Sequence, residues 1–371
     1  MQIRDYVVTH IKGGSLSSEL KAVWLNIVQN QQDPYFVHDV YWVSAYLRSN
    51  PAFAQSCHIF TLSQRNQTLA IYPLQYITAH RFGLQLNSWR IFWPSDMGIN
   101  DFILLPLPHS HKYIVLLKEY LNTLQDYPWD LLELQNVPEN TITAEALKER
   151  PVRQAVSVYH HDSKYLRCGV TYDESVAEIS SKFKKNNRRK MRNLEKLGKV
   201  TTAYFNQPEE LKQAFDAFLD VEAANWKGEQ NSALRHDERQ RCFYQELLHE
   251  YAGTGRCVIH LLYLDAVPIA GQFALISGNT LFLLKIGYNA EYQAMGPGGL
   301  LLDATLRKFS GDSVIKNISF VTGAKWNDDW APQVHHVFNH YIYNRTYKGL
   351  VSWLAETAKS GLRKIKHKFQ A

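Results

Sequence analysis

The 371-residue sequence has no long hydrophobic run and few cysteines. No stretch approaches the roughly 18 uncharged apolar residues that a membrane-spanning helix requires, and the N-terminus lacks the apolar core of a signal peptide. The four cysteines form no CxxC pair, so their spacing indicates neither a zinc ribbon nor a disulfide framework. These absences predict a cytoplasmic protein with reduced cysteines.

Several common functional signatures are also missing. The chain lacks the GK[ST] ending of a P-loop, the GxGxxG spacing of a dinucleotide-binding fold and the GxSxG elbow of an α/β-hydrolase. His335, His336 and His340 include one i, i+4 pair, but no acid or cysteine pattern accompanies them. We therefore expect no metal site and interpret these histidines as structural or surface residues.

The composition that is present, 45% hydrophobic and 20% charged residues, is typical of a soluble globular protein. A single core usually stops growing below about 250 to 300 residues, so the length predicts two domains. The order of predicted elements repeats once, with β-hairpins at 57–76 and 257–276. We therefore predict an α/β fold with mixed sheets in two tandem units, 1–155 and 156–345, followed by a basic amphipathic helix at 346–371.

A glycine-rich turn separates a predicted strand from a predicted helix in the second unit only. In "QAMGPGGLLL", glycines at 296, 298 and 299 would let several unpaired backbone N–H groups and the positive end of the helix dipole point at one spot. Side chains there would block a phosphate, and Pro297 stiffens the loop. The pattern predicts an anion site, and the alternative is an ordinary tight turn.

The same stretch resembles the acyl-CoA signature of the GNAT acetyltransferase superfamily, Q/R-x-x-G-x-G/A, matched here by Gln293, Gly296 and Gly298. Other segments resemble the CelD/BcsL-like branch, associated with bacterial cellulose and exopolysaccharide synthesis, whose members pair two GNAT-like units as the FemABX aminoacyltransferases do. The likeness runs from about residue 20 to 345. These segments are "AIYPLQY", "SKFKKNNRRKMRNLEKLGKV", "EAANWKGEQNSAL", "GYNAEYQAMGPGGLLL" and "FVTGAKWNDDW".

The resemblance implies two tandem GNAT-like domains, of which the first is degenerate and faces the substrate. It also implies acetyl-CoA or another acyl-CoA as co-substrate, without a metal. In the family the loop grips the pyrophosphate of coenzyme A, and the preceding strand separates from its neighbour and pairs with the pantetheine arm. The implied cofactor-binding residues are Lys285, Ile286, Gly287, Gln293, Gly296, Pro297, Gly298, Gly299 and Leu300.

Glu222 is the candidate general base, since it lies four residues before Trp226 and would share a helix face with this aromatic side chain. The alternative is a surface glutamate beside a packing tryptophan. Tyr288 or Tyr341 is a candidate acid for the leaving thiolate, and Lys325 completes the catalytic candidates. The family's G-D-x-x-Y-K-x-x-W stretch lacks its acid here, which leaves the equivalent lysine and tryptophan open. Candidates for substrate contact are Trp226, Lys227, Trp326 and Asp328.

The net charge is +6, and positive charge is concentrated in two basic segments. Residues 182–199 carry nine Lys and Arg against one acid, within a long helix predicted from Tyr172 to Leu197. This helix is either an ordinary solvated one or a site for an anion, such as the 3'-phosphate of coenzyme A, an acidic polymer, a lipid headgroup or RNA. RNA is disfavoured because no aromatic residues are interleaved. The C-terminal helix either packs on its own domain or contacts an anionic membrane or a partner.

We therefore expect an acyl-CoA-dependent acyltransferase that acts on an amine or hydroxyl of a sugar, a polysaccharide or an envelope precursor. Its expected location is cytoplasmic, with peripheral contact to an anionic inner membrane or a membrane synthase. One alternative is a FemABX-like aminoacyltransferase that uses aminoacyl-tRNA. Another is a non-catalytic, membrane-associated assembly factor for polysaccharide synthesis.

Overall fold

The computed structural model describes residues 2–3, 5–91, 98–149, 152–224 and 234–368, in two compact units. Both units are discontinuous in sequence, whereas the predicted division kept each one contiguous. Unit 2 takes a segment from near the N-terminus, and unit 1 takes the C-terminal residues. Unit 1 comprises Met1–Gln32, Pro51–Ser163 and His335–Ala371, and unit 2 comprises Asp33–Asn50 and Lys164–Val334.

Unit 1 is built on a mixed sheet with strand order β1-β2-β3-β4-β5-β7-β14-β8, in which β5 and β7 are parallel. Its strands are β1 (Gln2–Ile3), β2 (Tyr6–Lys12), β3 (Cys57–Gln64), β4 (Gln67–Arg81), β5 (Leu84–Ile91), β7 (Leu131–Pro138), β8 (Ala155–Arg167) and β14 (Gln333–Tyr343), and β6 (Ile103–Leu104) pairs with β4. Its helices are α1 (Ser18–Gln29), α3 (Pro51–Gln55), α4 (His111–Leu121), α5 (Ile142–Glu149) and α12 (Tyr347–Lys368).

Unit 2 has the strand order β9-β10-β11-β12-β13-β8, and β12 and β13 form its parallel pair. The strands are β9 (Val200–Phe205), β10 (Cys257–Leu264), β11 (Val267–Ser277), β12 (Thr280–Tyr288) and β13 (Asn317–Ser319). The helices are η1 (Phe36–His38), α2 (Val40–Ser49), α6 (Tyr172–Ser175), α7 (Ser181–Glu195), α8 (Pro208–Ala223), α10 (Glu238–Glu250), η3 (Ala290–Met295), α11 (Pro297–Phe309) and η4 (Lys325–Trp330).

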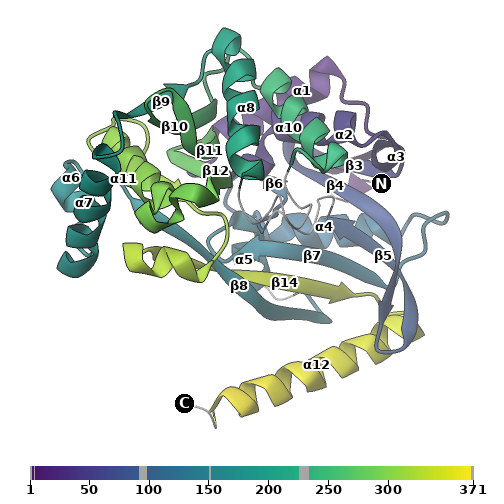
Figure 1. The fold of residues 1–371 in the computed structure, drawn as a ribbon. Coiled ribbons are helices and arrows are strands. Elements are labelled where there is room, and N and C mark those ends of the chain that lie inside the picture. The colour runs from purple at the N-terminus through teal and green to yellow at the C-terminus, as the bar shows by residue number, and fades with distance from the viewer. Residues whose placement is uncertain (1, 4, 92–97, 150–151, 225–233, 369–371) are drawn as a thin grey trace. The chain divides into compact units, whose positions relative to one another are not determined.

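Different helices cover the two faces of the unit 2 sheet. Successive side chains of β11 point to opposite faces and so contact different helices. Gly271 lies against Phe218 of α8, whereas the next residue, Gln272, accepts a hydrogen bond from Thr305 of α11 (2.8 Å). Figure 1 shows α8 and α10 on one side of β10–β12 and α11 on the other. The end of α8 and the start of α11 therefore lie at opposite faces of β12.

The predicted internal repeat is confirmed by the strand order. In both units an antiparallel hairpin, β3–β4 or β10–β11, is followed by a third antiparallel strand, β5 or β12. A parallel strand then joins this third strand, β7 in unit 1 and β13 in unit 2. The hairpins form where hydrophobic β-formers flank short polar turns, as the sequence pattern indicated.

The prediction of one continuous helix from Tyr172 to Leu197 is wrong, because the helix is interrupted near its middle. The structure has the short α6 followed by α7, which begins at Ser181. The side chain of Ser180 accepts the backbone N–H of Phe183 (3.2 Å) and caps a new helix start. The sequence pattern hid this break because the apolar spacing continues across it.

We expect the protein to lose stability in mild acid because three of its histidines are buried. Burial is the main cause that lowers the pKa of His58, His260 and His340 to about 4. Between about pH 6.5 and 4 these histidines are protonated in the unfolded chain but stay neutral in the folded protein. The free energy of unfolding is therefore highest near neutral pH and decreases as the pH falls through this range. Each histidine contributes a slope of up to about 1.4 kcal/mol per pH unit.

Urea unfolding at about pH 7 and about pH 5 measures this effect, and the midpoint is expected to fall at the lower pH. His260→Gln should reduce the dependence, since one of the three groups is removed. A midpoint that stays constant between the two pH values would contradict the prediction.

Candidate active site

The strand before the glycine turn, β12, separates from its parallel neighbour. Only Thr280–Phe282 pair with β13, opposite Asn317–Ser319. On its other side β12 pairs with β11, where Phe273 faces Lys285 and Ala274 faces Leu283, so Leu284 is an extra residue in a β-bulge. The bulge bends the strand just beyond the point where pairing with β13 ends, which agrees with the expected separation.

The carboxyl end of β12 lies directly against α8. A Cβ built on Gly287 would be 2.7 Å from Cα and 3.0 Å from Cβ of Glu222. The next connection continues this contact, because the N–H of Ala290 donates to the carbonyl oxygen of Ala224 (3.1 Å). Glu222 and the segment leading into the glycine turn are therefore neighbours, although 65 positions separate Glu222 from Gly287.

Glu222 is a buried carboxylate rather than a surface one, with a residue exposure of 0%. Its Oε2 accepts the backbone N–H of Leu234 (2.8 Å), the first described residue after the 225–233 gap. This bond holds Leu234 next to α8 and fixes the Glu222 carboxylate beside β12. The predicted partners Trp226 and Lys227 lie outside the described residues.

The glycine turn has fewer bare amides than the sequence predicted. Gly296 is left-handed (φ 58°, ψ 52°), which directs its carbonyl oxygen into α11, where it accepts the N–H groups of Gly299 (3.0 Å) and Leu300 (3.2 Å). The N–H of Gly296 donates to the carbonyl oxygen of Gln293 (2.9 Å). Among the described residues, only the Gly298 amide of this bend donates to no acceptor. The expectation of several bare amides is therefore wrong for Gly296, Gly299 and Leu300.

The turn nevertheless offers an open, positively charged surface. A Cβ built on Gly298 would meet only the Tyr288 ring, at 3.7 Å, and one on Gly299 would meet nothing within 4 Å. Lys190 of α7 reaches the turn, since its Nζ lies 2.8 Å from a Cβ built on Gly296. The described part of the chain contains no ion pair or hydrogen bond of Lys190. An ammonium, one bare amide and the helix dipole thus meet at the start of α11, an arrangement that fits the pyrophosphate of coenzyme A.

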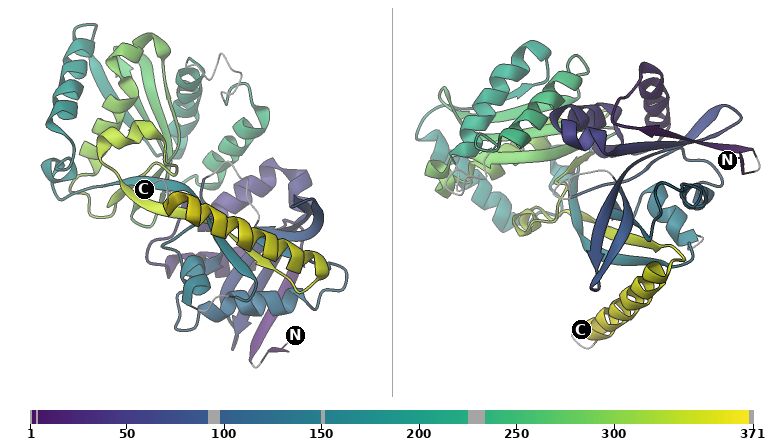
Figure 2. Two further views of the ribbon diagram at one scale, coloured as in Figure 1. Left: turned by 90° about the horizontal axis from the view of Figure 1, so that it is seen from below. Right: turned by 90° about the vertical axis from the view of Figure 1, so that its right-hand side faces the viewer.

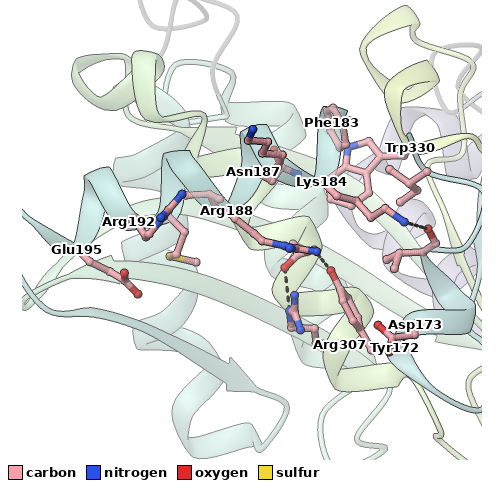
Figure 3. Close-up of a pocket in the computed structure, with 16 residues that line it drawn as sticks. Tyr172, Asp173, Phe183, Lys184, Asn187, Arg188, Arg192, Glu195, Arg307 and Trp330 are labelled. Atoms are coloured by element: carbon pink, nitrogen blue, oxygen red, sulfur yellow. Dashed lines mark hydrogen bonds and ion pairs between the residues drawn. The ribbon is translucent and has the colours of Figure 1, made fainter. Parts of the chain in front are cut away.

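A cavity of about 840 Å³ lies between α6, α7 and α11 in unit 2. Leu300, in the first turn of α11, lines it, so the cavity reaches the helix start. Phe183 and Trp330 form an edge-to-face pair at its wall (5.1 Å between ring centroids, 77°). Figure 3 shows Arg188 and Arg192 of α7 together with Arg307 of α11 around the same space.

Hydrogen bonds fix the α11 side of the cavity. The hydroxyl of Tyr172 donates to one carboxylate oxygen of Asp303 (2.5 Å), and Nε of Arg307 donates to the other (2.9 Å). Burial and the bond to Asp303 raise the pKa of Tyr172, so the phenol keeps its proton. The Arg307 guanidinium also stacks over the Tyr172 ring (3.5 Å). Asp303 is thereby neutralised, and the cations of α7 face the cavity.

Other predicted site residues are engaged elsewhere in unit 2. Lys285 donates to the side-chain oxygen of Gln240 on α10 (2.9 Å). Asp328 pairs with the ammonium of Lys164 (2.5 Å), which also donates to the carbonyl oxygen of Gly323 (3.2 Å) and so fixes η4. Trp326 is 48% exposed and packs edge-on against Phe320. Lys325 is exposed at the start of η4.

The remaining predicted positions are spread over three places. Ile286 of β12 packs against the apolar cluster that contains Leu302 and Leu306. Gln293 is exposed on η3, and Pro297 is buried at the first position of α11. The structure thus places Glu222 against Gly287 at one face of the end of β12 and the turn beside Tyr288 at the other, and it gives η4 separate contacts.

Sequence reasoning missed the individual residues of the cavity. It treated the basic stretch as one charged helix and did not single out Lys190 or Arg188. It also overlooked Tyr172, Asp303 and Arg307. The spacing of Asp303 and Arg307, four residues apart on a helix, was the one local signal for part of this group.

Comparison with known proteins agrees with this geometry. Residues 181–354 match the family described as Acetyltransferase (GNAT) domain. Among solved structures the chain is similar to FemX, with 12% identity, a TM-score of 0.59 and coverage of 93% of this chain and 100% of that one. It is also similar to L-PGS from Bacillus licheniformis, with 10% identity, a TM-score of 0.53 and coverage of 92% and 97%. At these identities the likeness concerns the fold alone.

No curated protein sequence matches the chain. In the described residues, no three or more His, Cys, Asp or Glu side chains are grouped as metal ligands would be, and no helix there has the length and apolarity to cross a membrane. The matched segment runs from the start of α7 into α12 and includes Glu222, β12 and the glycine turn. Residues 181–354 therefore resemble a GNAT-type acetyltransferase domain, and the chain has a GNAT-like mixed α/β fold.

Proposed function

We propose that the protein is an acyl-CoA-dependent acyltransferase. The observation that carries this proposal is the start of α11, where the open positions of Gly298 and Gly299 adjoin the Lys190 ammonium and a cavity lined by cations. GNAT folds typically use acyl-CoA, and this surface suits a diphosphate with an attached nucleotide. Lys190 and the Gly298 amide would hold the diphosphate, and Arg188 and Arg192 would face the nucleotide end.

Acyl-CoA supplies a thioester whose C–S bond breaks as a bond forms between the acyl carbon and an acceptor nitrogen or oxygen. Glu222 is proposed to accept the proton that the acceptor loses, directly or through water, because the buried carboxylate is fixed beside the end of β12. Tyr288, whose ring lies next to Gly298, is proposed to donate the proton that the leaving thiolate gains.

The acceptor is proposed to be an amine or hydroxyl of a sugar, in an envelope or secreted polysaccharide or in its lipid-linked precursor. This part rests on the resemblance to the CelD/BcsL-like branch of cellulose and exopolysaccharide synthesis. Such a precursor is made at the inner face of the membrane, so the proposed location is cytoplasmic and peripheral to that membrane. Lys325, Trp326 and Asp328 on η4 remain candidates for contact with the acceptor.

Calorimetric titration with acetyl-CoA tests the donor assignment. We expect a Kd in about the micromolar range. Gly298→Leu is expected to weaken binding by about tenfold or more, because the new side chain would fill the space in front of its own amide, which donates to no acceptor within the described bend. The fold should tolerate this change, since a Cβ at Gly298 meets nothing closer than 3.7 Å and leucine favours helices.

Gly361→Leu is the matched control, because Gly361 lies on α12 in unit 1 and a Cβ there also meets nothing within 4 Å. It should leave the affinity for acetyl-CoA unchanged. Failure of the unmodified protein to bind any acyl-CoA would overturn the proposal, and so would equal affinity of the Gly298→Leu variant.

A second candidate is transfer of an aminoacyl group from aminoacyl-tRNA. The fold similarity to FemX and L-PGS favours it, as does the row of cations on α7. Activity that is lost after ribonuclease treatment and needs no coenzyme A would select this candidate. Binding of neither acyl-CoA nor aminoacyl-tRNA would leave a non-catalytic assembly factor.

A further inference from the structure

The C-terminal helix α12 presents an apolar stripe to solvent, whereas Trp353 and small and polar side chains face the rest of unit 1. Gly349, Ser352 and Glu356, which recur at helical spacing, are buried against unit 1. In Figure 2, α12 (yellow) lies beside the β4–β5 hairpin of unit 1. An ordinary surface helix would bury its apolar stripe instead.

Specific contacts fix this orientation. The carboxylate of Glu356, only 2% exposed, pairs with Arg81 of β4 (2.5 Å), and that guanidinium stacks over the Tyr341 ring (3.7 Å). A Cβ at Gly349 would clash with the carbonyl oxygen of Asn344 and would lie 3.0 Å from that of Asp130, so glycine lets the start of α12 lie close to the rest of unit 1. Rolling α12 to bury its apolar side would break the buried ion pair, which is costly.

The outward side carries a continuous apolar stripe. Tyr347 is 81% exposed, Leu350 and Val351 are each 37% exposed, and Leu354 is 60% exposed. Their spacing of three, four and seven residues places them on one face of the helix, opposite the buried one. Single exposed apolar residues are normal on protein surfaces, but a contiguous group of four on one helix face is typical of an interaction site.

The net charge of the segment that carries the stripe indicates what it binds. The sequence from 346 to 371 holds six Lys and Arg, and its one acid is Glu356, which Arg81 neutralises inside unit 1. Lys348 and Lys359 are exposed, but they lie on the side of unit 1, where Lys348 donates to the carbonyl oxygen of Gln85 (3.1 Å) and Lys359 lies over the Phe82 ring (5.6 Å). A segment with an apolar face and a large positive net charge matches an anionic lipid surface.

We infer that α12 docks the protein on an anionic membrane surface through Tyr347, Leu350, Val351 and Leu354. The helix lies parallel to the surface, with the apolar side chains below the headgroups, and the positive net charge of the segment attracts the anionic lipids. A protein partner would satisfy the apolar stripe equally well, but it gives no reason for the excess of cations. This inference rests on α12 alone and does not depend on the proposed reaction.

Co-sedimentation of the full chain with vesicles tests the inference. We expect binding to vesicles that contain phosphatidylglycerol, weak binding to pure phosphatidylcholine vesicles, and release by added salt. Leu350→Glu with Leu354→Glu should weaken binding by about tenfold or more, because both apolar side chains are lost and two negative charges face the headgroups.

The matched control is Val267→Glu with Val314→Glu, which makes the same charge change at two unit 2 residues of similar exposure, 54% and 59%. The control should keep its vesicle binding, and both double variants should keep their affinity for acetyl-CoA. Absence of vesicle binding, equal binding to both vesicle types, or equal loss in both double variants would overturn the inference. Self-association abolished by Leu354→Glu, without vesicle binding, would assign the stripe to a second copy of the chain instead.

Discussion

Glu222→Gln is expected to lower kcat for acyl transfer by about 10² to 10⁴-fold, the usual range for loss of a general base. The amide keeps the size of the carboxylate, and its oxygen can still accept the N–H of Leu234, so α8 and the following chain should stay in place. The affinity for acyl-CoA should change little, because the turn and the cavity are unaltered. Release of free thiol from acetyl-CoA with an acceptor present measures the effect.

Glu210→Gln provides the matched control, because Glu210 is an exposed residue in the first turn of the same helix. It should retain full kcat. Glu222→Ala should in addition destabilise the fold by about 1 to 3 kcal/mol, since the buried N–H of Leu234 loses its acceptor. If Glu222→Gln keeps full activity while Glu222→Ala is destabilised, the carboxylate only ties the chain to α8, and the proposed base is wrong.

Gly287→Ala is expected to destabilise unit 2 by about 1 to 3 kcal/mol, near the upper end of that range. The new methyl group would meet the Cα and Cβ of Glu222, which a side-chain rotation cannot move, so the whole end of α8 would have to shift. The same shift would displace the Glu222 carboxylate, and kcat should fall with the stability. Urea unfolding gives the change in free energy.

The comparison variant is Gly298→Ala, which makes the same substitution eleven residues later, where a Cβ would meet only the Tyr288 ring at 3.7 Å. Its stability should be unchanged or slightly higher, because alanine favours a helix more than glycine does. Equal stability of the Gly287→Ala and unmodified proteins would show that α8 does not press on β12 as the structure has it.

The fold could largely be predicted from the sequence because its signals are local. Alternating apolar residues and short polar turns identify β3–β4 and β10–β11, and glycines before an apolar run identify the start of α11. The alternating stretch "HHVFNHYIY" is typical of a strand, and it forms most of β14. The prediction of a continuous helix at 172–197 failed because the apolar spacing continues past Ser180. At this residue a single side-chain cap starts a new helix.

The candidate site was less predictable because its contacts join distant parts of the chain. No pattern connects Lys190 with Gly296, or Glu222 with Gly287, until the strands are in register. The left-handed turn at Gly296 uses its own carbonyl oxygen to occupy two amides, which glycine content alone cannot reveal. The sequence predicted a basic amphipathic helix at the C-terminus, but which side of α12 meets the rest of unit 1 depended on the pairing of Glu356 with Arg81.

The place of β14 in the unit 1 sheet sets an order for folding during synthesis. This strand lies between β7 and β8, yet about 165 residues of chain separate its start from the end of β8, so the ribosome releases it long after its two neighbours. Until then the nascent unit 1 has two unsatisfied strand edges, which invite pairing with other chains. All the residues of unit 2 have been translated before β14 is complete. Unit 2 can therefore complete its folding before unit 1 does.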